Sequence, residues 1–252
     1  MVHPYIGVTG FMSAQEVNEV LQELPIESSR KFMVGVLASF KTIRGIPNKW
    51  PNRYPNPEDI AGIFVRHPVV LNLVHFNTKE PERLLAQMVE VTELGGENLH
   101  GFQLNLKWPD PRAIEGYKKK HPEKVIVLQC GGGALAEVGK NPQSLSNSAK
   151  MYEGLCEYLL IDPSGGYGIP FDTAKGLEFL KALHSSIKGM GFGIAGGLSP
   201  ETLDLLKPIV EAFPSTSIDA EGRLRDGNDH LDVAKAKRFV ALAEVVFRQY
   251  EG

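Results

Sequence analysis

Cysteine, long apolar runs and an excess of basic charge are all scarce in this sequence, and each shortage excludes a class of protein. Two cysteines in 252 residues do not make a disulfide framework and fit a reducing compartment. No apolar run approaches the roughly 18 residues of a membrane span. Even Val69–Phe76 is broken by Asn72 and His75. Lys and Arg number 27 against 30 Asp and Glu, so the basic excess that suits nucleic-acid backbones is missing.

The first residues also lack the pattern of a secretory signal. Met1–Tyr5 contain no basic segment that leads into an apolar stretch. We therefore expect a cytoplasmic protein with neither a nucleic-acid nor a membrane partner. Hydrophobic residues make up 42% and charged residues 23%, which is typical of a folded globular chain and not of a disordered one. The sequence indicates no particular oligomeric state.

Short apolar segments of strand length alternate with helical patterns along the whole chain. They are rich in Val, Ile, Leu and Phe and show little polar alternation, which is typical of parallel strands buried on both faces. The eight predicted strands are Tyr5–Thr9, Phe32–Ser39, Val69–Phe76, His100–Leu106, Lys124–Gln129, Tyr158–Asp162, Gly191–Ala195 and Thr216–Ala220. The segments between them are long enough for crossover helices.

Helix-capping residues occur where the crossover helices should begin. Ser13 opens a capping box, and Asn56, Asp110 and Ser199 each precede a Pro at a first helical position. Eight strand–helix units without a break in composition predict an α/β protein, a (β/α)₈ TIM barrel that forms a single domain over residues 1–252. A doubly wound open sheet is the alternative.

The active site of such a barrel lies at the C-terminal ends of its strands, so polar residues there are the first candidates. They are Thr9, Ser39, His75, Asn77, Gln103, Asn105, Gln129, Cys130, Asp162, Asp219 and Glu221. Polar residues at strand ends often only cap the next turn, and this simpler role is the alternative for each of them.

Two further features indicate an anionic ligand. Residues 30–57, around the second strand and its loop, carry six cations and no carboxylate, and charge of one sign beside a pocket raises the local concentration of anions. Gly196 and Gly197 follow the seventh strand and precede the helix expected at Ser199. Their amides at a helix N-terminus predict a phosphate site. A solvated basic loop and ordinary turn chemistry are the respective alternatives.

Other kinds of chemistry lack the residues they need. No Lys lies in strands five to seven beyond Lys124, which disfavours a Schiff-base enzyme. No pair of His residues has metal-ligand spacing, and no phosphate-binding Walker sequence occurs. We therefore expect no metal and no cofactor, and proton-transfer or binding chemistry on a small anionic molecule.

The order of several motifs resembles phosphoribosylanthranilate isomerase, a (β/α)₈ barrel enzyme of tryptophan biosynthesis. Arg53–Asp59 is similar to the family's segment after strand two, and Leu160–Asp162 with Gly165–Gly168 to its strand six and glycine loop. Gly196–Glu201 resembles the family's Gly-Gly-Leu-x-Pro-Glu, and Ser217–Asp219 its strand eight. The resemblance extends over essentially the whole barrel and is strongest from the sixth strand to the eighth.

This resemblance implies an Amadori rearrangement, which converts an aldose N-glycoside into an aminoketose. It implies that Asp162 is the acid that protonates the furanose ring oxygen and that Arg53 holds the substrate carboxylate. Gly196, Gly197 and Gly222 are implied to line the phosphate site. The chemistry suits these residue types, because a buried carboxylic acid can donate a proton and a guanidinium binds a carboxylate in a fork.

Two positions depart from the family pattern. The family's base is a Cys at the end of strand one, where Thr9 stands here, and a Thr hydroxyl is a far weaker acid than a thiol. Cys130 and Glu221 are the candidate substitutes, with a buried filler as the alternative for Cys130. The second position is Glu221, which stands within Ala220–Gly222 where the family has Ser-Ser-Gly after strand eight. Glu221 would repel a phosphate, so we expect either that it pairs with a cation, with Arg223 or Arg225 as candidates, or that the ligand is not the family's phosphate.

Three readings therefore stay open from the sequence. The first is an isomerase-family barrel with a remodelled pocket that acts on a small phosphorylated or carboxylated sugar derivative. The second is a non-catalytic or differently specific barrel that binds a small anion, or a non-catalytic relative that binds a protein partner. The third is a true phosphoribosylanthranilate isomerase with a substitute base.

Overall fold

The chain folds into a closed barrel of eight parallel strands that pair in sequence order, β1 with β2 and onward until β8 pairs with β1. This is a computed structural model, and it describes residues 2–163 and 172–250. The strands are β1 Tyr5–Thr9, β2 Lys31–Ser39, β3 Val70–Asn77, β4 Gly101–Leu104, β5 Val125–Gly131, β6 Tyr158–Asp162, β7 Gly191–Ala195 and β8 Ser217–Ala220. The predicted (β/α)₈ barrel is confirmed, and the open sheet is excluded.

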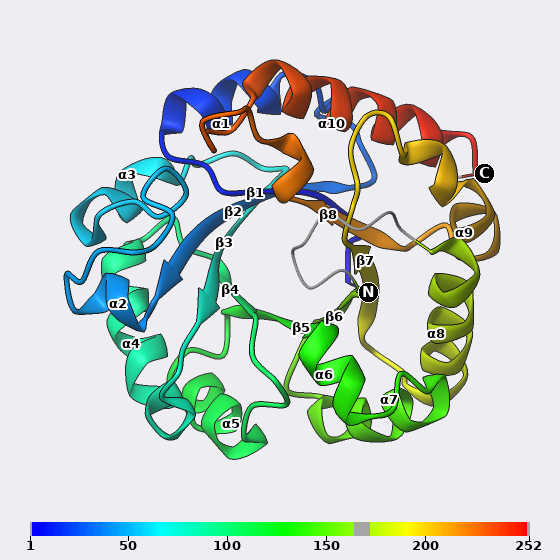
Figure 1. Cartoon of the computed structure of the whole chain (residues 1–252), viewed down its shortest axis with the longest axis horizontal. Helices are drawn as coiled ribbons and strands as arrows, with labels where there is room; N and C mark the ends of the chain where they lie inside the picture. The colour runs from blue at the N-terminus through cyan, green and yellow to red at the C-terminus, as the bar shows by residue number, and fades with distance from the viewer. Residues whose placement is uncertain (1, 164–171, 251–252) are drawn as a thin grey trace.

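Helices form a ring around the strands (Figure 1). They are α1 Ala14–Leu21, α2 Phe40–Ile43, α3 Ile60–Ile63, α4 Leu84–Gly95, α5 Pro111–Lys120, α6 Gly132–Glu137, α7 Pro142–Ala149, α8 Thr173–Ser186, α9 Lys207–Ala212 and α10 Val233–Arg248. Ser13 and Asp110 cap α1 and α5 as predicted, through hydrogen bonds to the amides of Glu16 and Arg112. Asn56 makes no side-chain cap bond and precedes only a short 3₁₀ turn. No helix within residues 2–163 and 172–250 is long and apolar enough to cross a membrane.

The prediction of a helix that begins at Ser199 is wrong, because the chain forms a turn there. Gly196 and Gly197 have positive φ angles of 96° and 67°. The hydroxyl of Thr202 accepts from the Ser199 amide at 2.9 Å and donates to the Gly197 carbonyl at 3.0 Å. These bonds satisfy the backbone locally, so helical structure begins only with the 3₁₀ turn Leu203–Leu206 before α9.

The barrel interior has an apolar half and a polar half. Apolar side chains inside the barrel pack into one cluster, separate from the cluster between the strands and the helices, and all of its members except Ala195 lie below the carboxyl ends of the strands. Its members are Tyr5, Met33, Leu71, Leu73, Val127, Tyr158, Leu160 and Ala195. The polar residues Thr9, His75, Gln103, Gln129, Asp162 and Asp219 are buried near the carboxyl ends of their strands. The apolar half thus closes the barrel beneath a polar layer.

Large inward side chains fit because small residues stand opposite them. A Cβ atom on Gly191 of β7 would lie 2.7 Å from the ring of Tyr158 on β6. A Cβ atom on Gly101 of β4 would lie 1.8 Å from the main-chain oxygen of Val125. A side chain can rotate away from such a contact, but a paired strand backbone cannot move without breaking its ladder.

We therefore expect Gly101→Ala to lower the free energy of unfolding by about 3 kcal/mol, at the upper end of the range for overpacked cores. The control is Gly62→Ala in α3, where no atom lies within 4 Å of the added Cβ. That change should be neutral or raise stability by up to about 1 kcal/mol, because Ala favours helix over Gly. Urea unfolding of both variants measures the difference. Equal stabilities would contradict the assigned strand packing.

Candidate active site at the carboxyl ends of the strands

A small cavity of about 40 Å³ opens at the carboxyl ends of the strands. Five of the residues predicted from sequence line it: Asp162, Gly196, Gly197, Glu221 and Gly222. Also lining it are His75, Gln129 and Asp219, which the sequence placed only among the general strand-end candidates. The glycine loop at Gly165–Gly168 lies outside the described residues. The structure thus brings β6, β7 and β8 together at one site.

Asp219 is at the centre of a hydrogen-bonded chain that crosses the barrel. The Thr9 hydroxyl lies 3.0 and 3.2 Å from its two carboxylate oxygens and donates to them. Gln103 Nε2 donates to Asp219 Oδ2 and to Gln129 Oε1, each at 3.0 Å. Gln129 Nε2 then donates to Asp162 Oδ2 at 3.1 Å. Two glutamines therefore connect the carboxyl groups of β8 and β6.

Burial changes the acidity of Asp219. The residue is only 5% exposed, and desolvation raises the pKa of its carboxyl group to about 7. Hydrogen bonds from Gln103 and Thr9 oppose that rise, whereas the nearby charges of Glu221 and Asp162 add to it. A carboxyl group with a pKa near 7 can both accept and donate a proton at neutral pH, as general acid–base catalysis requires.

His75 adds a polar group but no positive charge to the site. The ring is 5% exposed, and burial lowers its pKa below the ordinary value, so the imidazole is neutral at pH 7. Asn105 Nδ2 lies 3.2 Å from His75 Nε2, at hydrogen-bonding distance. An imidazole in this state does not attract an anion by charge.

Arg53 is held by two carboxylates. Its Nε lies 2.8 Å from both oxygens of Asp229, and its Nη1 lies 2.8 Å from Glu221 Oε1. The hydrogen bond with Asp229 is the main reason that the pKa of Arg53 is raised. Glu221 does pair with a cation, but this cation is Arg53 and not Arg225, which donates to the main-chain oxygens of Thr9 and Gly10. A substrate carboxylate that binds Arg53 competes with these two acids for its donors.

The six cations of residues 30–57 do not share one loop. Arg30 and Lys31 lie before and at the start of β2, at the end of the barrel away from this cavity. Arg30 is 1% exposed, donates to the Thr216 main-chain oxygen at 2.8 Å and stacks on Phe247. Arg30 therefore has a structural role, because it links the segment before β8 to α10.

Cys130 lies on the other face of β5 from this site. Its neighbour Gln129 points into the barrel, and successive strand residues point to opposite faces. The Cys130 side chain packs in the outer apolar cluster, and burial raises the pKa of its thiol to about 12. The structure does not bring it to the cavity.

The arrangement suits proton transfer between these carboxyl groups and a molecule bound in the cavity. Two buried acids at the ends of β6 and β8 face one cavity, and their hydrogen-bonded glutamines hold the carboxylate orientations. Among residues 2–163 and 172–250, no group of three or more His, Cys, Asp or Glu side chains is placed to hold a metal ion. Sequence reasoning missed the central position of Asp219, although its place at the end of a buried strand was visible.

The raised pKa of Asp219 predicts a pH dependence of stability. Between about pH 4 and pH 7 the folded chain binds a proton that the unfolded chain has lost, so the free energy of unfolding falls as pH rises. We expect Asp219→Asn to remove about 2–3 kcal/mol of that fall between pH 5 and pH 8. Urea unfolding at the two pH values measures it. Asp204→Asn, at a side chain that is 82% exposed, should keep the wild-type slope. If the free energy of unfolding changed equally with pH in Asp219→Asn and Asp204→Asn, the raised pKa of Asp219 would be contradicted.

Comparisons with known proteins identify the fold but no family. No protein-family model matches the sequence. No curated protein matches it. Phosphoribosyl anthranilate isomerase from Thermotoga maritima is similar in structure, with 18% identity over 96% of this chain and 99% of that chain and a TM-score of 0.62.

Other solved barrels are nearly as similar. N-(5'-phosphoribosyl)anthranilate isomerase from Pyrococcus furiosus matches with 15% identity over 96% of this chain and 100% of that chain, at a TM-score of 0.60. 2-Keto-3-deoxy-6-phospho-gluconate aldolase from Zymomonas mobilis matches with 14% identity, over 97% and 94%, at 0.52. Enzymes of different chemistry share this architecture. The chain is therefore a (β/α)₈ barrel similar in fold to phosphoribosylanthranilate isomerases and to an aldolase.

Proposed function

We propose that this barrel catalyses an Amadori-type isomerisation of a small phosphorylated or carboxylated aldose derivative. The observation that carries the proposal is the pair of buried carboxyl groups, Asp162 and Asp219, on one cavity, with the Asp219 pKa near 7. The reaction needs one group to donate a proton and another to accept one. The motif order of the sequence and the similarity in fold agree with this reaction class.

The two carboxyl groups have separate roles in the proposed mechanism. In its protonated form, Asp162 gives a proton to the ring oxygen of the N-glycoside, the bond from that oxygen to C1 breaks, and the C1–nitrogen bond becomes an iminium. Asp219 then takes the proton from C2, which yields an enolamine that tautomerises to the aminoketose. Asp219 suits this step because it is half ionised near pH 7.

Thr9 acts in this mechanism by positioning Asp219. A Thr hydroxyl is too weak an acid to serve as the base itself, but it donates to both Asp219 oxygens. That hydrogen bond stabilises the ionised form and keeps the pKa of Asp219 lower than burial alone would set it. Cys130, on the outer face of β5, takes no part in this proposal.

The substrate's anionic group has two candidate anchors. Arg53 can hold a carboxylate in competition with Glu221 and Asp229, and the amides of Gly196, Gly197 and Gly222 border the position where a phosphate would lie. The occupied guanidinium of Arg53 also favours a second candidate function, a barrel of different specificity that binds another small anion. Turnover together with ligand-induced stabilisation separates the two, because a binder gains stability without turnover.

Asp162→Asn and Asp219→Asn should each lower kcat for phosphoribosylanthranilate by about 10²–10⁴-fold, the usual contribution of a positioned acid or base. Without Asp162 no group donates the proton to the ring oxygen, and without Asp219 no group accepts the proton from C2. Asp204→Asn, at an exposed ion pair with Lys207, is the matched control and should keep wild-type turnover. Fluorescence-monitored turnover measures all four proteins. A wild-type chain that is stabilised by the compound but does not turn it over would support the binder instead.

Thr9→Val should shift the ionisation that limits kcat/KM at acid pH to a higher pH. The lost hydrogen bond to a charged group is worth about 1.5–3 kcal/mol, so we expect a shift of about one pH unit or more. Thr9→Ser retains the hydroxyl and should retain the wild-type profile. A uniform loss of rate at every pH in Thr9→Val would show that the residue acts through packing alone.

A further inference from the structure

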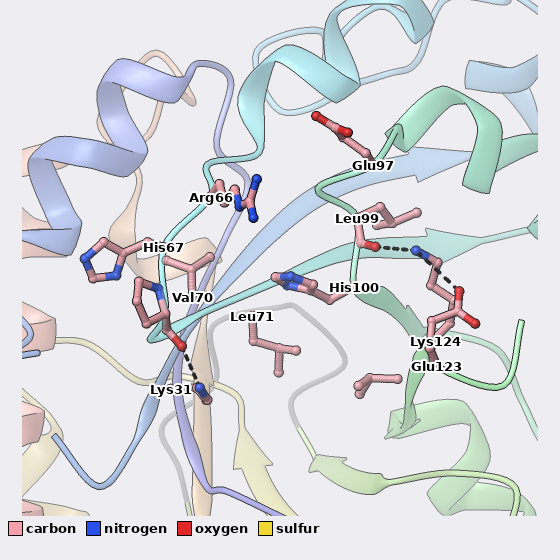
Figure 2. Close-up of a pocket in the computed structure, with 12 residues that line it drawn as sticks. Lys31, Arg66, His67, Val70, Leu71, Glu97, Leu99, His100, Glu123 and Lys124 are labelled. Carbon is pink, nitrogen blue, oxygen red and sulfur yellow. Dashed lines mark hydrogen bonds and ion pairs between the residues drawn. The ribbon is translucent and has the colours of Figure 1, made fainter. Parts of the chain in front are cut away.

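A second, larger hollow lies at the opposite end of the barrel from the proposed active site. Its volume is about 820 Å³, within the usual range for small-molecule sites. It is formed where β2, β3, β4 and β5 begin (Figure 2). The residues that line it are Lys31, Arg66, His67, Pro68, Val70, Leu71, Glu97, Leu99, His100, Glu123, Lys124 and Val125. The proposed reaction uses none of them.

Positive groups from three separate segments converge on this hollow. Lys31 begins β2, Arg66 lies in the segment before β3, and Lys124 directly precedes β5. Figure 2 shows Lys31 and Lys124 on opposite sides, with Leu71 and His100 between them. Lys31 Nζ and Lys124 Nζ each donate to one main-chain oxygen, those of Pro68 and Leu99, at 2.6 Å. An ammonium group has three donors, so each retains hydrogen-bonding capacity.

Two carboxylates, Glu97 and Glu123, also border the hollow, and both are exposed. The Glu123 side chain is 63% exposed and lies 3.8 Å from Lys124 Nζ, a distance at which a solvated ion pair contributes little. Three cations against two solvated acids leave a net positive charge. The Lys124 side chain is only 13% exposed, whereas Glu97, Glu123 and Arg66 are exposed.

His100 adds an oriented donor to these charges. Its Nδ1 accepts from the main-chain amide of Asn72 at 2.8 Å, so the neutral ring carries its proton on Nε2. Burial lowers the pKa of His100, and the positive charges of Lys124 and Lys31 lower it further. The ring is therefore neutral at pH 7.

Asn72 holds the rim in place. Its side-chain Nδ2 donates to the main-chain oxygens of Val65 and Asn98, each at 2.9 Å. Those two residues belong to the segments that carry Arg66 and Glu97 into the hollow. One fully buried side chain thus fixes both segments before any ligand binds, and a preformed site loses less entropy on binding.

The floor between the charged groups is apolar. Val70, Leu71, Leu99 and Val125 line it, and Leu71 belongs to the apolar cluster inside the barrel. A free inorganic ion would leave that surface exposed to water, whereas a ligand with an apolar body would cover it. The combination selects a molecule with one charged end and one apolar part.

We propose that this hollow is a binding site for a small organic anion, a phosphate or carboxylate group attached to an aromatic or aliphatic body. The anionic group contacts Arg66 and is attracted at longer range by Lys31 and Lys124, and the body covers the apolar floor. The site is independent of the proposed isomerase reaction, since the two cavities share no residue.

The test uses 1-naphthyl phosphate and 1-naphthoate as probes, with calorimetry on the full chain. We expect saturable binding of one equivalent. Arg66→Met should weaken it by about tenfold, the loss expected for a hydrogen bond to a charged group. Arg66 is exposed, so its replacement leaves the fold intact. Lys120→Met removes the same charge from an exposed position in the last turn of α5 and should leave binding unchanged.

Further arms identify the two parts of the ligand. Neutral 1-naphthalenemethanol and inorganic phosphate should each bind at least tenfold more weakly than 1-naphthyl phosphate. Equal binding of the neutral alcohol would overturn the role of the charge, and equal binding of inorganic phosphate would overturn the role of the apolar floor. Absence of saturable binding, or binding that neither Arg66→Met nor Lys31→Met weakens, would overturn the site.

Discussion

Closure of eight parallel strands forces every second side chain into one confined space, and the rest of the molecule depends on how that space is filled. Towards the amino ends the residues are large and apolar, with Tyr5 and Tyr158 in edge-to-face contact at a ring separation of 5.2 Å. Glycines such as Gly191 make room for them. The apolar half excludes water from below the polar layer, and it is this exclusion that gives Asp219 its raised pKa.

Hydrogen bonds within the polar layer offset the desolvation of its buried carboxyl groups. Asp219 accepts hydrogen bonds from Thr9 and Gln103, and Gln129 extends the contact to Asp162. A buried carboxylate without such donors would stay protonated far above neutral pH, and a fully solvated one would be ionised at every physiological pH. The balance between desolvation and these bonds holds the group near pH 7, where proton transfer in both directions is possible.

The two ends of the barrel differ in charge. At the carboxyl ends, Arg53 is bound by Glu221 and Asp229, so its positive charge is neutralised within the protein. At the amino ends, Lys31 and Lys124 donate to main-chain oxygens, and the exposed Glu123 lies 3.8 Å from Lys124 Nζ. A ligand's anionic group therefore competes with two carboxylates in close contact with Arg53 at one end, and with a more distant, exposed carboxylate at the other.

The sequence by itself determined the fold and most of the strand ends. Eight buried apolar runs with crossover segments have few ways to bury both faces, and a closed parallel barrel is the one that the structure adopts. Because carboxyl ends of such strands meet at one end, Asp162, Glu221 and the glycines after β7 and β8 could be placed together in advance. The helix expected at Ser199 could not, because the Thr202 hydroxyl satisfies the local backbone in a turn.

Tertiary structure alone decided which face each strand residue occupies and which charges meet. Strands buried on both faces show no polar alternation, so nothing local distinguishes inward Gln129 from outward Cys130. Arg53 and Glu221 stand 168 positions apart, and only the closed barrel brings them within 2.8 Å. The pKa of Asp219 likewise depends on side chains from β1 and β4, because desolvation is a property of everything packed around a group and not of its neighbours in sequence.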